Sequence, residues 1–124
     1  MPLPGRLNIT VYQGDDFDRE FFVEEIVGEE QVPVDFTTHE VSAFVRTHPS
    51  SPRVIGVFDI LWPSDGEGGE DQSQGIFNAS LPSSVTSKFP SECVYDIQST
   101  DTATGRTKTW VYGTIRVIKQ VTRG

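Results

Sequence analysis

The stretch "NITVYQGDDFDREFFVEE", residues 8–25, decides how the chain folds. Two runs rich in Val, Ile and Phe flank an acidic turn at residues 13–16. Apolar and polar side chains alternate over 7–12, which predicts a half-buried strand, and a second strand is predicted over 17–27. Gly14 allows the positive φ that a tight turn needs, and the neighbouring carboxylates stay solvated or cap the turn. The acidic turn is therefore interpreted as a corner between two strands and not as a catalytic site.

The amino-acid composition favours strands over helices. Val, Ile and Thr number 34 among the 124 residues, whereas Ala and Leu number only seven. Branched side chains fit a pleated sheet and lose rotamer freedom in a helix. A chain of this length suggests one domain and buries enough surface for a core without disulfides. Its single cysteine, Cys93, cannot form an intrachain disulfide, so the fold does not depend on an oxidising compartment.

The pattern along the chain predicts an all-β, immunoglobulin-like antiparallel β-sandwich of about seven strands. After the first two strands, a short extended piece is expected at 32–36 and further strands at 41–46, 53–62, 76–81, 93–99 and 108–121. One short helix is expected over 81–89, before the sixth strand, with a serine N-cap and with Val85 and Phe89 on one face. The fourth strand is apolar on both parities, which predicts cover on both faces, and the last strand is expected to bend at Gly113.

We expect an N-terminal arm, residues 1–6, followed by a single β-sandwich domain, residues 7–124. Two prolines and a glycine argue against a strand within the arm. The clearest loop is 63–75, with four glycines, four acidic residues and no apolar residue. We expect this loop to be mobile in the free protein and to become ordered at an interface.

The net charge of −8 is unevenly distributed along the chain. Residues 1–101 hold all 18 acidic residues and five basic ones, whereas residues 102–124 hold five basic residues and no acidic one. The acidic body disfavours nucleic acid as a partner. The basic end either contacts a partner or lies beside an acidic strand of the same sheet, where opposite charges stabilise slightly. On the first interpretation, the candidate interface residues are Pro2, Leu3, Pro4, Arg106, Lys108, Arg116, Lys119 and Arg123.

No combination of residues in the sequence indicates catalysis. Cys93 falls inside a predicted strand, where a lone cysteine usually acts as a small buried hydrophobe. His39 and His48 lie near strand ends, and no G-x-S-x-G motif supplies a nucleophile. One cysteine and two isolated histidines are too few for a zinc site, and the acidic groups at 15–18 and 65–71 offer oxygen ligands without the spacing of a calcium loop. We therefore predict a protein that is not an enzyme and that has no metal or other cofactor.

The sequence gives no sign of a membrane partner. It contains no run of about 18 apolar residues, so no membrane-spanning helix is predicted. Its first residues lack the apolar core of a secretory signal.

Sugar binding stays open as an alternative. Tyr12, Trp62, Trp110 and Tyr112 would stack on sugar rings if they were exposed. Aromatic residues in sandwich strands more often belong to the core or to an interface.

Four segments follow one another in an order typical of one family. They are "VYQGDDFDREFFV", "VPVDFTTHEVSAFVR", "FNASLPSSVTSKFP" and "CVYDIQSTDTATGRTKTWVYGTIRVIKQVTR". The family's motifs stand here as Q-G-D at 13–15, V-D-F-T at 34–37, V-Y-D-I at 94–97, G-T-I-R-V at 113–117 and V-T-R at 121–123. Phe36 replaces the usual leucine. With these motifs the chain resembles small tailed-phage virion proteins and is similar to the N-terminal domain of upper baseplate and tail-fibre-attachment proteins.

The resemblance implies a non-enzymatic structural protein of a tailed bacteriophage particle, assembled in the host cytoplasm and located in the virion. Larger relatives continue into a receptor-binding or fibre region, whereas this chain ends at Gly124, so the expected role is a tail, baseplate or fibre-attachment adaptor. The expected partners are other phage structural proteins, with this chain as a homo-oligomer in a symmetric assembly. A capsid decoration (cement) protein is one alternative, and a carbohydrate-binding module for host attachment is another.

Overall fold

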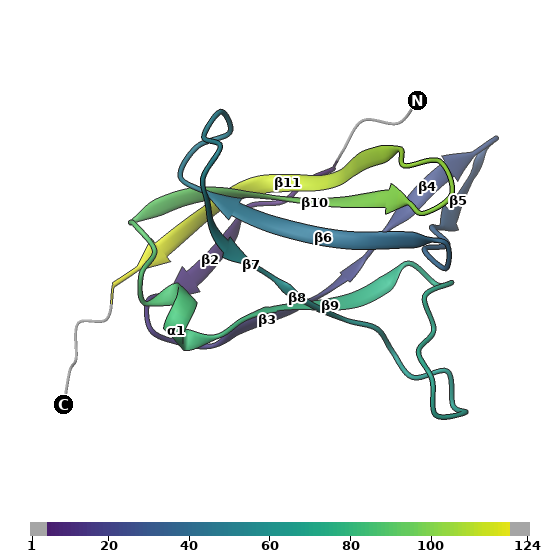
Figure 1. Cartoon of the computed structure of the whole chain (residues 1–124), viewed down its shortest axis with the longest axis horizontal. Helices are drawn as coiled ribbons and strands as arrows, with labels where there is room; N and C mark the ends of the chain where they lie inside the picture. Colours follow the sequence, from purple (N-terminus) through teal and green to yellow (C-terminus); the bar gives the residue numbers. More distant parts are fainter. Residues whose placement is uncertain (1–4, 120–124) are drawn as a thin grey trace.

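The computed structural model describes residues 5–119 (Figure 1). Its regular structure is nearly all strand, which confirms the all-β prediction. The strands are β1 (Gly5–Arg6), β2 (Ile9–Tyr12), β3 (Phe17–Phe22), β4 (Glu24–Val27), β5 (Glu30–Pro33), β6 (His39–Arg46), β7 (Val54–Val57), β8 (Asp59–Leu61), β9 (Ile76–Leu81), β10 (Glu92–Asp101) and β11 (Thr107–Ile118). A short helix, α1 (Ser83–Thr86), precedes β10 as predicted. No helix within the described range is long and apolar enough to cross a membrane.

Two facing sheets form the sandwich (Figure 1). The larger sheet has the order β1–β11–β10–β6–β7, with β2 also paired to β11, and the smaller sheet has the order β3–β9–β8. The last two strands and β6 thus share one sheet, while β3, β9 and β8 share the other, which is the division of an immunoglobulin-like sandwich. Most pairs are antiparallel, but β1 and β2 run parallel to β11. A separate two-stranded sheet, the β4–β5 hairpin, projects at one end.

Two of the predicted strands divide because the chain crosses between sheets. The predicted strand 17–27 breaks at Val23, where β3 leaves the smaller sheet and β4 begins the hairpin. The predicted strand 53–62 breaks at Phe58, since β7 pairs with β6 in the larger sheet and β8 pairs with β9 in the smaller one. Both crossing residues are buried. The structure therefore has more separate strands than the predicted seven while keeping the predicted fold.

The prediction that both faces of residues 53–62 are covered is wrong. The exposed fractions are 37% for Val54, 51% for Val57 and 59% for Leu61. Since β7 is the edge of the larger sheet and β8 is the edge of the smaller one, one side of each lacks a neighbouring strand within the described part of the chain. Apolar residues occur on both parities because the core-facing side changes at the register shift near Ile55, and because Val57 and Leu61 are apolar although they are exposed.

Aromatic side chains form much of the core. Phe36 is 1% exposed and contacts Trp62, Phe77 and Trp110, with ring centroids 5.8, 6.2 and 5.9 Å away. Trp110 also donates its indole N–H to Ser99 Oγ at 2.9 Å. Edge-on and tilted ring contacts stabilise the fold beyond the burial of apolar area. Both tryptophans are therefore partly buried and pack against the core.

The N-terminal boundary of the sandwich differs from the prediction. Gly5 and Arg6 were assigned to the arm, but they form β1 and pair with Val111 and Tyr112 of β11. They follow the prolines, so their own backbone N–H groups remain available for pairing. The rest of the predicted arm lies outside the described residues.

The irregularity of the last strand pair lies away from Gly113. The register shift between β10 and β11 falls between Ile97 and Gln98. Gly113 instead permits a close approach of the N-terminal segment, because a Cβ built there would lie 1.9 Å from the Leu7 carbonyl oxygen. The Leu7 N–H donates to Tyr112 O at 2.9 Å, which holds the two segments together.

The acidic turn is a corner, and it also supports the helix. Gly14 has a φ of 87°, as the turn requires. Asp16 Oδ1 accepts a hydrogen bond from the Ser83 N–H at 2.7 Å, at the start of α1. The predicted serine N-cap is wrong, because Pro82 occupies that position and the carboxylate of a distant residue supplies the acceptor.

Candidate interaction surfaces

The basic residues predicted as an interface are spread along β11 and are not brought together. Arg106 precedes the strand and Lys119 follows it, so an extended chain separates them by roughly 40 Å. Lys108 Nζ lies 4.0 Å from the ring centroid of Trp110. Arg116 stands opposite Glu92 of β10, which agrees with the interpretation that an acidic neighbour balances the basic strand. Pro2, Leu3, Pro4 and Arg123 lie outside the described residues.

Cys93 lies in the core as a small apolar side chain. It is fully buried in β10, and burial raises the pKa of its thiol to about 11. His39 pairs with Asp101 at the far end of the same strand, about 27 Å away along the strand. The Nδ1 atom of His48 is instead 2.9 Å from Ser50 Oγ. The separation of Cys93 from His39 agrees with the prediction that they do not form a catalytic pair.

Carboxylates of the loops accept hydrogen bonds from their own backbone. Asp65 Oδ1 accepts two from N–H groups of the 63–75 loop, at 2.7 and 3.0 Å. The hydroxyl and the backbone N–H of Ser73 donate to Asp71 and hold the pKa of that carboxyl below its ordinary value. No group of three or more His, Cys, Asp or Glu within the described residues is placed to hold a metal ion. These acids shape the loop, as Asp residues commonly do in turns.

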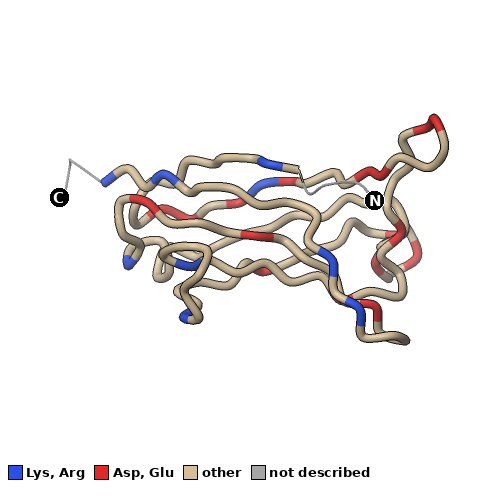
Figure 2. The backbone as a smooth tube through the Cα atoms, turned by 90° about the horizontal axis from the view of Figure 1, so that it is seen from above, with Lys and Arg blue, Asp and Glu red and all other residues tan. Residues whose placement is uncertain are grey.

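The β4–β5 hairpin exposes apolar side chains next to acidic ones. Ile26 is 64% exposed, Val27 is 57% exposed and Phe22, just before the hairpin, is 55% exposed. A cavity of about 310 Å³ lies beside the hairpin, lined by Phe22, Ile26 and Trp110 among others. In Figure 2 the acidic segments gather at the end of the sandwich that carries this hairpin. This end of the molecule therefore exposes apolar side chains on both faces of the hairpin, among acidic residues.

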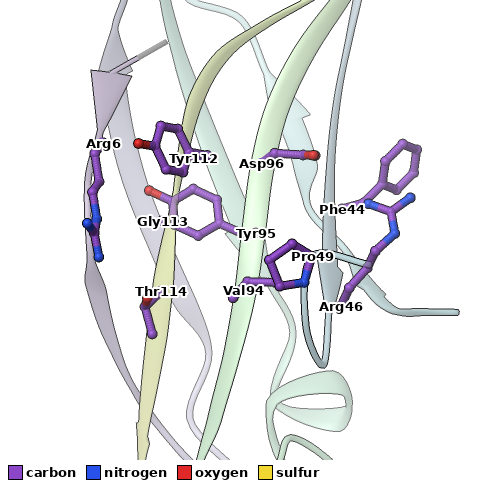
Figure 3. A pocket seen from close by; sticks show the side chains of 10 residues that line it. All are labelled: Arg6, Phe44, Arg46, Pro49, Val94, Tyr95, Asp96, Tyr112, Gly113 and Thr114. Atoms are coloured by element: carbon purple, nitrogen blue, oxygen red, sulfur yellow. The ribbon is translucent and has the colours of Figure 1, made fainter. Parts of the chain in front are cut away.

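A second cavity, of about 340 Å³, lies on the outer face of the larger sheet (Figure 3). Its floor contains Phe44 of β6, Asp96 of β10 and Tyr112 of β11, which stand opposite one another in register. Arg6 of β1 pairs with Tyr112 and extends the same row. Arg46 lies with its guanidinium 5.5 Å from the ring centroid of Phe44. Four strands thus bring together residues that are far apart in the sequence.

Asp96 is the unusual group of this cavity. Its Oδ1 atom is buried and has no hydrogen-bond partner among the described residues. Burial raises the pKa of the Asp96 carboxyl, and the nearby positive charge of Arg46 opposes that effect. The prediction of interface residues missed this site, because only the register of three strands places Asp96 between Phe44 and Tyr112. The alternation of β6 and β10 was a partial signal, since it puts both residues on the face away from the core.

Of the four aromatic residues considered for sugar binding, Tyr12 and Tyr112 are exposed, and Trp62 and Trp110 are partly buried. Tyr12 is 56% exposed on β2, and Tyr112 is 44% exposed in the outer-face cavity.

Comparison with known proteins gives no family assignment. No family model matches the chain, and no curated protein matches it either. Among solved structures, a family 123 glycoside hydrolase from Clostridium perfringens resembles it with a TM-score of 0.38 and 14% sequence identity. The match covers 96% of this chain and 24% of that chain. A likeness this weak transfers no activity from one protein to the other.

Proposed function

We propose that this chain is a non-enzymatic structural protein of a tailed-phage particle, where it acts as an adaptor at the tail, the baseplate or a fibre-attachment point. The ordered motifs of the sequence support the assignment to such particles. Their residues also have structural roles that suit the shared fold: Gly14 makes the first corner, and Gly113 admits the N-terminal segment against β11. The work of such a protein is to bind neighbouring chains through the surfaces of its sandwich.

The observation that carries the proposal is the pair of exposed apolar side chains on the β4–β5 hairpin, Ile26 on the face of the cavity and Val27 on the opposite face. A two-stranded hairpin is marginal in water unless it packs against something else. Ile26 and Val27 nevertheless direct most of their surface to solvent. Contiguous exposed apolar residues with a polar rim are typical of protein–protein contacts. We therefore assign the hairpin as the main attachment surface.

Charge favours a partner whose contact surface is apolar with basic groups around it. Glu24, Glu29 and Glu30 are exposed on the hairpin. Arg116 and Lys119 are exposed toward the other end of β11, which runs away from the hairpin (Figure 1). A second copy can therefore place Arg116 and Lys119 against the acidic hairpin of the first, a head-to-tail contact that closes into a ring when the rotation allows. Several weak contacts of this kind add up to firm attachment in a symmetric assembly.

The test replaces exposed apolar residues of the hairpin and measures incorporation into particles. The double variant Ile26→Ser, Val27→Ser should keep its thermal stability, since both side chains are exposed. Its recovery with purified particles should fall by about tenfold or more, because multivalent attachment amplifies each lost contact. The matched control is Val57→Ser, a similarly exposed residue on the β7 edge. Unchanged recovery of the double variant, or loss with the control alone, would refute the role of the hairpin.

A further inference from the structure

The outer-face cavity offers one small molecule three kinds of contact at once. Phe44, Asp96, Tyr112 and Arg6 stand in one row across four strands, at the spacing of about 4.8 Å between neighbours. The row faces away from the core, because the residues on the other parity, such as Ala43 and Ile97, are buried. This surface is separate from the hairpin, so a site here goes beyond the adaptor role.

Asp96 defines the first contact. Its Oδ1 atom is shielded from water and unpartnered among residues 5–119, which leaves a strong acceptor unsatisfied. Figure 3 shows its side chain directed toward the side where Phe44 and Arg46 lie. A hydroxyl group in the cavity would supply this hydrogen bond once the Asp96 side chain turns Oδ1 out of its shielded position. Because such bonds involve a charged acceptor, they are among the stronger ones.

Two guanidinium groups define the second contact. Arg6 and Arg46 both line the cavity, against the single carboxylate of Asp96. The site is therefore locally positive in a chain whose net charge is −8. A planar guanidinium matches a carboxylate or phosphate with paired hydrogen bonds. An ammonium group from a partner lysine fits less well, since both arginines would repel it.

The aromatic rings and the size of the cavity define the third contact. Phe44 and Tyr112 flank Asp96 and offer apolar surface to the C–H face of a ring. The volume of about 340 Å³ is at the small end of the range for ligand pockets. Hydroxyl donors, an apolar ring face and an anionic substituent occur together in acidic sugars. We propose that this cavity binds a saccharide carrying an acidic group, with Asp96 accepting from a hydroxyl and Arg46, on the side toward which Asp96 is directed, holding the anion.

The experiment screens the whole chain against acidic oligosaccharides that carry hexuronate, sialate or sugar-phosphate groups, together with neutral oligosaccharides of equal length. The best acidic probe is then titrated by calorimetry against variants. Asp96→Asn and Tyr112→Ala should each weaken binding by about tenfold or more, the loss expected for one charge-assisted hydrogen bond or one stacked ring. Arg46→Gln should reduce the preference for the acidic probe over its neutral counterpart.

Matched controls exist outside the cavity. Asp59→Asn on β8 and Tyr12→Ala on β2 change the same residue types at exposed positions and should leave the affinity unchanged. Thermal unfolding of each variant shows whether it is folded. If Tyr112→Ala does not fold, Asp96→Asn still tests the site. Three results would overturn the proposal: no acidic probe binds, neutral probes bind as well as acidic ones, or Asp96→Asn binds like the wild type. None of them bears on the hairpin, so the two proposals fail separately.

Discussion

Gly113 and Leu7 approach each other so closely that no side chain fits between them. A Cβ at Gly113 would lie 1.9 Å from the Leu7 carbonyl oxygen and 2.7 Å from its carbonyl carbon. The same carbonyl oxygen accepts a hydrogen bond from Tyr95 Oη at 2.6 Å. The Leu7 carbonyl thus adds to the strand pairing that attaches the N-terminal segment to the larger sheet.

Replacing Gly113 by alanine should destabilise the protein. The added methyl group must displace backbone, which costs about 1–3 kcal/mol in a well-packed interior. Urea unfolding followed by tryptophan fluorescence measures the change. Gly5→Ala is the matched control, because its Cβ would meet the Trp110 carbonyl oxygen at an ordinary 3.7 Å. Equal stability of the two variants would contradict the close approach.

Tyr95→Phe tests the hydrogen bond to the Leu7 carbonyl. The change removes only the hydroxyl group and leaves that carbonyl without this donor. We expect a loss of about 1–2 kcal/mol in the free energy of unfolding. Faster hydrogen exchange at the amides of β2 and the start of β11 should accompany it. Tyr112→Phe, at an exposed position, should cost much less.

Asp16→Ala tests whether a distant carboxylate caps α1. The variant loses the hydrogen bond that Asp16 Oδ1 accepts from the Ser83 N–H. Removal of such a capping acceptor typically costs about 1 kcal/mol. Chemical denaturation gives the number, and Asp18→Ala on exposed β3 is the control. If both variants are equally stable, the carboxylate does not support the helix.

The free energy of unfolding should fall in alkaline solution, partly because the Cys93 thiol loses its proton. Burial raises the pKa of its thiol from 9.0 in the unfolded chain to about 11 in the folded one. The folded state therefore holds the proton more tightly, so the contribution is present below pH 9 and is lost as the pH rises toward 11. Burial of Tyr95, with its pKa raised to about 12, acts in the same direction between pH 10 and 12.

The variant Cys93→Ala isolates the contribution of the thiol to this pH dependence of stability. It should be less stable than the wild type at pH 8, because it leaves a small cavity. The difference in unfolding free energy between the two proteins should shrink as the pH rises from 9 to 11. A difference that stays constant over this range would show that the thiol does not titrate with a raised pKa.

The sequence predicts those parts of the fold that depend on local pattern. The corner at Gly14 and the strand alternation around Cys93 follow from turn chemistry and from period two, and both agree with the structure. The crossing at Phe58 was missed, because the alternation of core-facing residues continues through it. The apolar but exposed Val57 and Leu61 made the segment look covered on both faces. The cap from Asp16 was missed because it joins segments 67 residues apart.

The candidate sites were harder to predict because they depend on register. The arm and the basic C-terminal residues were predicted as an interface from charge and composition. Neither property shows that β11 separates its basic residues. Asp96 lies in the V-Y-D-I motif at 94–97, but its neighbours Phe44 and Tyr112 come from two other strands. No local signal marks an unpartnered carboxylate between two aromatic rings. Such a site becomes visible only when the strands are paired.

The most direct test of the phage assignment is the copy number of this chain in purified particles. Quantitative mass spectrometry against the major capsid protein gives that number. An adaptor at the tail predicts from a few to a few dozen copies, as expected for symmetric rings. A ratio near one copy per capsid subunit would contradict the tail position and favour a capsid decoration protein. Complete absence from the particle would contradict the structural role altogether.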